Sequence, residues 1–253
     1  MPNYVINEIQ FGSKEAYDDV YAKFVTHDEE SGETYFDFEK ILPTPPEVKA
    51  LPASSTVDDG IELIYADSDA AGKGEIKRLL QASCIPFLTL SQELKELDYQ
   101  DAHPEEVEAM RERLGQTPGQ LEETLELGRK AIENLRNHGA RHWYDWCVEH
   151  WGTKWNSMDC LFSPNDLTMT FQTAWDCPIG ILAELTRLGY AFSCRFADED
   201  LGHGCGVFVS SGNGTCAIRS GGEMSDPEGF AIHLWGYDDL YKKDENGEWV
   251  YLG

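Results

Sequence analysis

The chain has 253 residues, of which 46 are acidic and 20 are basic, so its net charge at pH 7 is -26. A surface this negative repels the phosphate groups of nucleic acids, which disfavours direct nucleic-acid binding, and we expect none. With 41% hydrophobic residues, the chain can bury the core of one large domain or two smaller ones. It has no apolar run that could span a membrane and no secretory signal, so we expect a soluble cytoplasmic protein without membrane contacts.

The cysteines argue against a metal cofactor. There are seven, and no two of them have the C-x-x-C spacing of a zinc site. Their odd number and scattered positions also do not form a disulfide framework. We expect reduced thiols that pack as small hydrophobic side chains, and no cofactor.

The N-terminal part begins with a predicted strand and helix. Residues 4–11 alternate between apolar and polar, and Ser13 stands at the N-cap of a helix with Tyr17, Val20 and Phe24 on one face. An acidic loop over residues 27–33 follows this helix.

The next segments are predicted as an extended stretch and then helices. Residues 34–38 have an extended pattern and lead into a proline-rich turn, and weaker helical patterns cover residues 61–66 and 74–83. The pattern over residues 104–139 is strongly helical, with a break near Gly115, and predicts a helical hairpin.

The C-terminal half has the pattern of an antiparallel sheet with helices on one face. Residues 167–175 predict a strand, Cys177 and Pro178 open a helix that ends near Gly189, and residues 190–196 predict a second strand. Two further strands, at 206–211 and 215–219, flank a glycine-rich turn. This order predicts an α+β fold.

We expect three parts along the chain. Residues 1–97 form an N-terminal α+β module, residues 98–142 form the helical hairpin that joins the modules, and residues 143–253 form the C-terminal domain.

Several sequence blocks resemble one bacterial family. They are the opening strand, Phe36–Pro45, Trp143–Trp146, Trp151–Asn156, Phe171–Trp175, and Ala197–Gly202 with Cys205 and Gly206. Together they resemble the phage- and plasmid-borne Api-like family with a YubB-type ferredoxin-like C-terminal domain. The resemblance implies a ferredoxin-like fold, an origin on a mobile element and no assigned biochemical activity. The fold name refers to the chain path alone, because the clustered cysteines of an iron–sulfur site are missing.

The acidity suggests a function in protein binding. We expect a non-catalytic accessory protein, a counter-defence inhibitor of the anti-CRISPR or anti-restriction type. Its carboxylates would imitate nucleic acid and occupy a basic groove on a nucleic-acid-handling complex of the bacterial host. The candidate binding residues lie in the acidic loop and the helical hairpin: Asp28, Glu29, Glu30, Glu33, Glu105, Glu106, Glu122, Glu123 and Glu126.

Other interpretations stay open. Acidity on every segment also fits a protein that needs it for solubility alone. A small-ligand or metal-dependent enzyme could use a crevice at Asp198–Cys205, where Asp198, Glu199, Asp200, His203 and Cys205 supply metal-capable atoms. These residues are also ordinary loop formers, and as a mixed set they designate no single metal. A phage assembly module is a third interpretation, and the sequence leaves the oligomeric state open.

Overall fold

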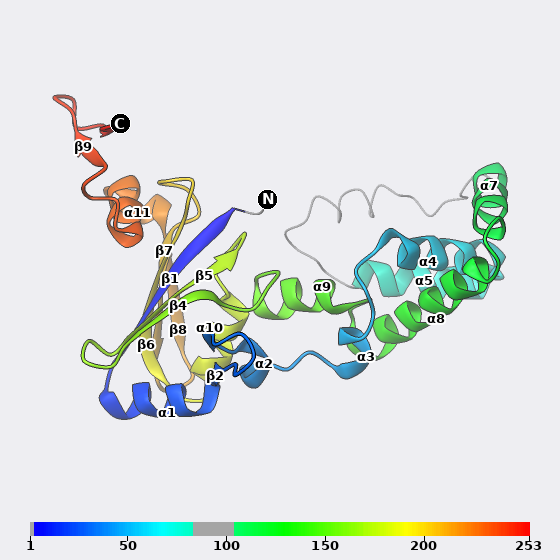
Figure 1. Ribbon diagram of the computed structural model, residues 1–253, viewed down its shortest axis with the longest axis horizontal. Coiled ribbons are helices and arrows are strands. Elements are labelled where there is room, and N and C mark those ends of the chain that lie inside the picture. Colours follow the sequence, from blue (N-terminus) through cyan, green and yellow to red (C-terminus); the bar gives the residue numbers. More distant parts are fainter. Residues whose placement is uncertain (1–2, 83–103) are drawn as a thin grey trace. The chain divides into compact units, whose positions relative to one another are not determined.

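The structure, a computed structural model, describes residues 3–82 and 104–253. Contacts divide the chain into two compact units, shown in Figure 1. We call Met1–Pro43 with His150–Gly253 the sheet unit, and Thr44–Glu149 the helical unit. No helix of the described residues has the length and apolar character needed to cross a membrane.

The sheet unit is built around six antiparallel strands. They are β1 (Tyr4–Phe11), β4 (Met158–Ser163), β5 (Thr168–Ala174), β6 (Ala191–Asp198), β7 (Gly206–Ser211) and β8 (Cys216–Ser220). Their order across the sheet is β4-β5-β1-β6-β7-β8, so the N-terminal strand lies at its centre (Figure 1). The α+β class with an antiparallel sheet is therefore confirmed.

Two helices complete a β-α-β-β-α-β path with the first four of these strands. Helix α1 (Lys14–Phe24) follows β1, and α10 (Ile179–Arg187) connects β5 to β6. The predicted N-cap is confirmed, because the Ser13 hydroxyl accepts a hydrogen bond from the Ala16 amide at 3.2 Å. The chain between α1 and β4 contains the whole helical unit, which is thus an insertion into this path.

The structure groups the chain differently from the predicted ranges 1–97, 98–142 and 143–253. Strand β1 forms ladders with β5 on one side and β6 on the other, which joins the first residues to the C-terminal half. An edge-to-edge ladder leaves no sign in a local sequence pattern, since alternation shows only that a strand exists.

The two faces of the sheet have different covers. Val5, Ile9 and Phe11 are buried on the face that packs against α1 and α10. Alternation turns Ile6 and Ala197 to the other face, where helix α11 (Pro227–Trp235) packs against them. The prediction of helices on one face therefore misses α11. A 3₁₀ turn (Gly221–Glu223) precedes this helix, and the hairpin of β9 (Tyr241–Lys243) and β10 (Trp249–Tyr251) follows it.

A small hairpin lies beside the sheet. Strand β2 (Val25–His27) pairs with β3 (Thr34–Phe36), and helix α2 (Phe38–Ile41) follows. The predicted extended stretch ends at Phe36, because the Asp37 carboxylate accepts a bond from the Glu39 amide and caps α2. Phe36 is fully buried, with its ring centroid 5.5 Å from that of Phe171 of β5.

The described residues of the helical unit, 44–82 and 104–149, form four longer and two short helices. They are α3 (Pro46–Lys49), α4 (Ser55–Asp67), α5 (Ala70–Ala82), α7 (Pro104–Gly115), α8 (Gln120–His138) and α9 (Trp143–Trp146), and a π-helical turn (Cys147–Trp151) follows α9. The predicted helical hairpin corresponds to α7 and α8. Part of the predicted helix at 74–83 is confirmed as α5, and its last residue lies outside the described residues.

Helices α4 and α8 pack backbone to backbone. A Cβ added to Gly60 would come within 2.2 Å of the Thr124 carbonyl oxygen, and one added to Gly128 within 2.3 Å of the Gly60 carbonyl carbon. Only glycine permits this approach. Nearby, the buried Arg141 guanidinium pairs with Asp145 at 2.7 Å and with Asp58 at 2.5 Å.

Candidate functional site

The acidic loop forms a tight turn between β2 and β3. The Asp28 amide donates to the Glu33 carbonyl at 2.8 Å, and the Asp28 carboxylate accepts from the amides of Glu30 and Ser31 at 2.8 and 3.4 Å. These bonds, the Glu30 amide first, lower the pKa of Asp28. Asp28 therefore shapes the turn, while Glu29, Glu30 and Glu33 are exposed on it.

The neighbouring edge strand β4 carries a bulge. Met158 lies opposite Gln172 but Leu161 lies opposite Thr170, so β4 has one extra residue between the two pairs. Asp159, within the bulge, has φ of 48°, a left-handed conformation that is uncommon for residues other than glycine. The bulge exposes the Asp159 carboxylate at the edge of the sheet.

Polar side chains fasten the small hairpin to the start of β4. The Asn156 side-chain amide donates to Asp37 at 2.9 Å, and its oxygen accepts from the Phe38 amide at 2.9 Å. The Ser157 hydroxyl donates to the Phe36 carbonyl at 2.7 Å. This network fixes the acidic turn next to the bulge, within one unit.

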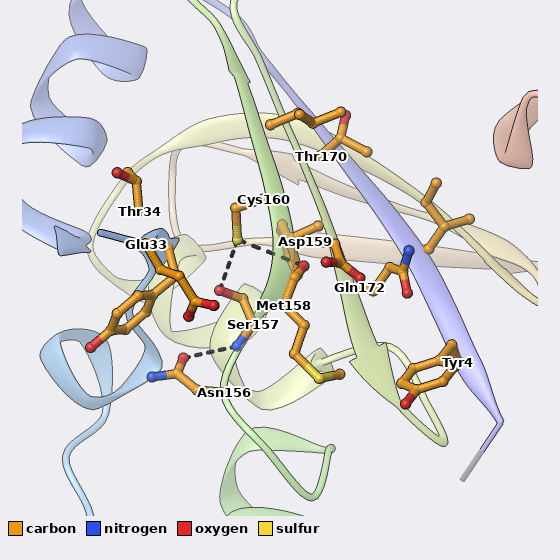
Figure 2. Close-up of a pocket in the computed structure, with 14 residues that line it drawn as sticks. Tyr4, Glu33, Thr34, Asn156, Ser157, Met158, Asp159, Cys160, Thr170 and Gln172 are labelled. Atoms are coloured by element: carbon orange, nitrogen blue, oxygen red, sulfur yellow. Dashed lines mark hydrogen bonds between the residues drawn. The ribbon is translucent and has the colours of Figure 1, made fainter. Parts of the chain in front are cut away.

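A groove of about 1060 Å³ runs along β4, and we call it the hairpin groove. Figure 2 shows Glu33 and Thr34 on one side of β4 and Thr170, Gln172 and Tyr4 on the other. None of the fourteen lining residues is Lys, Arg or His. Glu33 and Asp159 give the groove negative charge, and the lining also includes apolar side chains from β1, β4 and β5.

The carboxylates near the hairpin groove are not neutralised within the described parts of the chain. There, no basic side chain forms an ion pair with Glu29, Glu30, Glu33 or Asp159. Carboxylates that lack a cation of their own can attract one from another molecule.

Two possible nucleophiles in the groove, the Ser157 hydroxyl and the Cys160 thiol, take part in structural contacts. The Cys160 sulfur lies 3.1 Å from the Ser157 oxygen, and burial raises the pKa of the Cys160 thiol. A raised pKa disfavours the thiolate, which is the nucleophilic form. The lining also contains no histidine that could act as a base for these groups.

The nine predicted binding residues fall into two groups. Asp28, Glu29, Glu30 and Glu33 come together in the turn of the sheet unit. The other five belong to the helical unit: Glu105 and Glu106 start α7, and Glu122, Glu123 and Glu126 lie along α8. Of the residues that line the groove, Asp159 was missed by sequence reasoning, because a lone acidic residue between apolar neighbours gives no sign of a bulge.

Two of the predicted binding carboxylates on α8, Glu122 and Glu126, have partners on the same helix. Arg129 pairs with Glu122 at 3.0 Å and with Glu126 at 3.5 Å, and Lys130 pairs with Glu126 at 3.4 Å. These pairs are exposed and reduce the negative charge that α8 presents to a partner.

The Asp198–Cys205 loop uses its polar groups to form a turn. The Asp198 carboxylate accepts from the Asp200 amide at 2.7 Å, and the Cys205 thiol is buried, which raises its pKa. His203 lies 3.5 Å from Asp200 at the surface. In residues 3–82 and 104–253, no group of three or more His, Cys, Asp or Glu side chains is placed to hold a metal ion. These contacts do not support a ligand or metal site at Asp198–Cys205.

Comparison with known proteins agrees with the predicted fold. Residues 150–230 match the model of a family described as the ferredoxin-like domain in Api92-like protein. The match covers β4 to β8 and α10, which supports the predicted family resemblance and ferredoxin-like fold. No curated protein matches the chain. The chain is also similar to the crystal structure of a protein api92 from Yersinia pseudotuberculosis, with a TM-score of 0.36 and 9% identity over 89% of this chain and 97% of that one.

Proposed function

We propose that this protein is a non-catalytic binding protein whose hairpin groove receives a basic segment of another protein. The observation that carries the proposal is the group of carboxylates on Glu29, Glu30, Glu33 and Asp159, which lack basic partners among the described residues. The apolar part of the groove lining gives such a segment contact area that charge alone does not provide.

The partner fits the description of a nucleic-acid-handling protein of a bacterial host. A cleft that binds nucleic acid carries spaced Lys and Arg side chains, and exposed carboxylates can occupy the positions that phosphates otherwise take. Together with the net charge of -26, this supports the role of a counter-defence accessory protein.

The test compares two variants with the same change in charge. One replaces Glu29, Glu30 and Glu33 by Lys, and the other replaces Glu122, Glu123 and Glu126 by Lys. Proteins that co-purify with the wild-type chain from bacterial cells are identified, and the affinity of each variant for the isolated partner is measured. We expect the hairpin variant to lose at least tenfold in affinity and the α8 variant to lose much less, because two of its three carboxylates, Glu122 and Glu126, already have partners.

Competition then tests the mimicry. If the hairpin occupies a nucleic-acid cleft, a DNA or RNA ligand of the partner and the wild-type chain exclude each other, and added salt weakens both complexes. Equal losses in the two variants would assign the binding to net charge and remove the hairpin groove from the proposal. Simultaneous binding of nucleic acid and this chain would remove the mimicry but not the groove.

A further inference from the structure

Strand β8 forms an open edge of the six-stranded sheet, at the end opposite to β4. All five of its residues are exposed, and Ile218 is 52% exposed. At the two ends of the β7–β8 ladder, the Ser211 amide donates to the Thr215 carbonyl and the Gly221 amide donates to the Cys205 carbonyl. Ser211 with Thr215, and Cys205 with Gly221, are therefore hydrogen-bonded pairs. Such pairs alternate along an antiparallel ladder. The backbone groups of Cys216, Ile218 and Ser220 therefore point outward, where another strand could bind them.

This edge lacks the features that keep edge strands apart. It contains no proline and no bulge, and its one charged residue is Arg219. Residues 201–222 are the longest stretch of the chain without Asp or Glu. On a molecule with a net charge of -26, a second copy is repelled at most surfaces, and this strand is where its approach meets the least repulsion.

The opposite edge is protected. Strand β4 is bulged, and β3 lies against it through the bond from Ser157 to Phe36. A β8 strand therefore cannot continue the sheet by binding β4 of the next molecule. The remaining arrangement is pairing of β8 with β8 of a second copy. Because this interface is two-fold symmetric, it joins two molecules and does not extend to a third.

We propose that two copies of this chain associate through antiparallel β8 strands with Ile218 on the two-fold axis. In this register Ile218 of each copy exchanges both backbone hydrogen bonds with its equivalent, and Cys216 lies opposite Ser220 of the second copy. Ala217 lies opposite the second copy's Arg219, so the two arginines are not directly opposed. This interface is distinct from the hairpin groove.

The dimer is expected to be weak. A five-residue strand pair buries less than the roughly 800 Å² per partner of a standard interface. Two molecules of the same high charge also repel each other, and salt screens that repulsion. Dimerisation should therefore strengthen as salt is added, whereas binding of a basic partner at the hairpin groove should weaken. Because salt changes the two kinds of binding in opposite directions, failure of the dimer proposal can be told apart from failure of the proposed function.

Sedimentation of the full chain from micromolar to near-millimolar concentration tests the dimer. We expect a monomer–dimer equilibrium that shifts toward dimer at high salt. Ile218→Pro removes the outward amide at the axis, and proline is tolerated at such edge positions. It should weaken association at least tenfold, while Ile218→Val, which keeps the amide and a β-branched side chain, should change it by less than about threefold. A circular dichroism spectrum equal to that of the wild type shows that the proline variant is folded.

Cysteine cross-linking tests the register. In a Cys216→Ser background, Ile218→Cys places two thiols across the axis at a Cα separation of about 5.5 Å, within reach of a disulfide. In Ala217→Cys, each new thiol lies opposite Arg219 of the second copy and two residues away from the other thiol. Its cross-linking should therefore be at least fivefold slower than that of Ile218→Cys. A monomer at all concentrations, a dimer that Ile218→Pro leaves intact, or equal cross-linking of the two cysteine variants would overturn the proposal.

Discussion

The acidic turn of the sheet unit and the acidic face of α8 both carry closely spaced carboxylates, but they differ in how many of these have a basic partner. On α8, Arg129 lies within 3.5 Å of two glutamates. In the turn, Asp28 accepts backbone hydrogen bonds and Glu29, Glu30 and Glu33 have no basic partner among the residues described. A count of acidic residues treats both regions alike, although Glu122 and Glu126 of α8 already have basic partners and the three glutamates of the turn have none among the described residues.

The difference follows from the local structure that carries the charge. A helix brings residues three, four and seven positions apart onto one face, so that a single Arg can reach two Glu side chains. A tight turn points successive side chains in different directions and uses one of them, Asp28, to hold its own backbone. On α8 this spacing pairs Glu122 and Glu126 with basic residues, whereas the turn leaves Glu29, Glu30 and Glu33 exposed.

The largest expected effect concerns the buried pairing in the helical unit. Arg141→Met would leave the Asp145 carboxylate buried without its partner, and loss of one member of a buried pair costs about 3–5 kcal/mol. Urea unfolding at neutral pH should show a loss of this size in the free energy of unfolding. Replacing both Arg141 and Asp145 by apolar residues should recover part of it, because the fully buried Asp145 carboxylate is then absent and only the partly exposed Asp58 loses its partner. A loss below about 1 kcal/mol in the single variant would contradict the role assigned to Arg141.

The pH dependence of the same variant sharpens that prediction. Burial, partly offset by Arg141, raises the pKa of Asp58. For a carboxyl with a raised pKa, the ionised form destabilises the fold at high pH, and the penalty is relieved as the pH falls through the raised value. Without Arg141 this penalty grows. The difference in unfolding free energy between Arg141→Met and the wild type should therefore shrink as the pH is lowered from 7 toward 5.

A smaller effect is expected in the turn. Asp28→Ala removes the acceptor of the Glu30 and Ser31 amides, and hydrogen exchange of these two amides should accelerate a few-fold. The folded pKa of Asp28 is lowered, so its contribution is present above the ordinary value of 3.8 and is lost as the pH falls through the lower folded value. Exchange of the wild-type amides, corrected for intrinsic rates, should approach that of the variant below this pH. Unchanged exchange in Asp28→Ala would assign the turn to other contacts.

Local patterns predicted much of this fold. The alternation of residues 4–11 and the helical spacing over 104–139 appear as β1, α7 and α8, and the Ser13 cap is present. Strand β4 was not predicted, because its bulge breaks the alternation of the sequence. Helix α11 was also missed. It is buried over much of its length and lacks the polar face that makes a helix visible in a sequence.

The candidate site was predictable only in its acidic part. Glu33 was found from charge, and the structure places it in the lining of the hairpin groove. Its neighbours Asp159, Thr170 and Tyr4 come from three different strands. Their proximity depends on ladder register and on the bulge, neither of which the composition of a segment encodes. Ion pairing on α8 was readable in principle, since Glu126 and Lys130 have the spacing of a helical pair.

The smallest expected effect tests whether α8 stays out of the binding surface. Replacing Arg129 and Lys130 by Ala frees the carboxylates of Glu122 and Glu126, so that α8 resembles the turn in its unpaired charge. Because these side chains are exposed and their pairs are screened by solvent, the urea midpoint should change by no more than the scatter between repeated measurements. If the partner contacts the hairpin groove, its affinity for this variant should rise by less than about twofold through long-range attraction alone. The affinity could instead rise by as large a factor as it falls when Glu29, Glu30 and Glu33 are replaced by Lys. That result would place α8 in the contact surface, because freed carboxylates change the affinity so strongly only at short range.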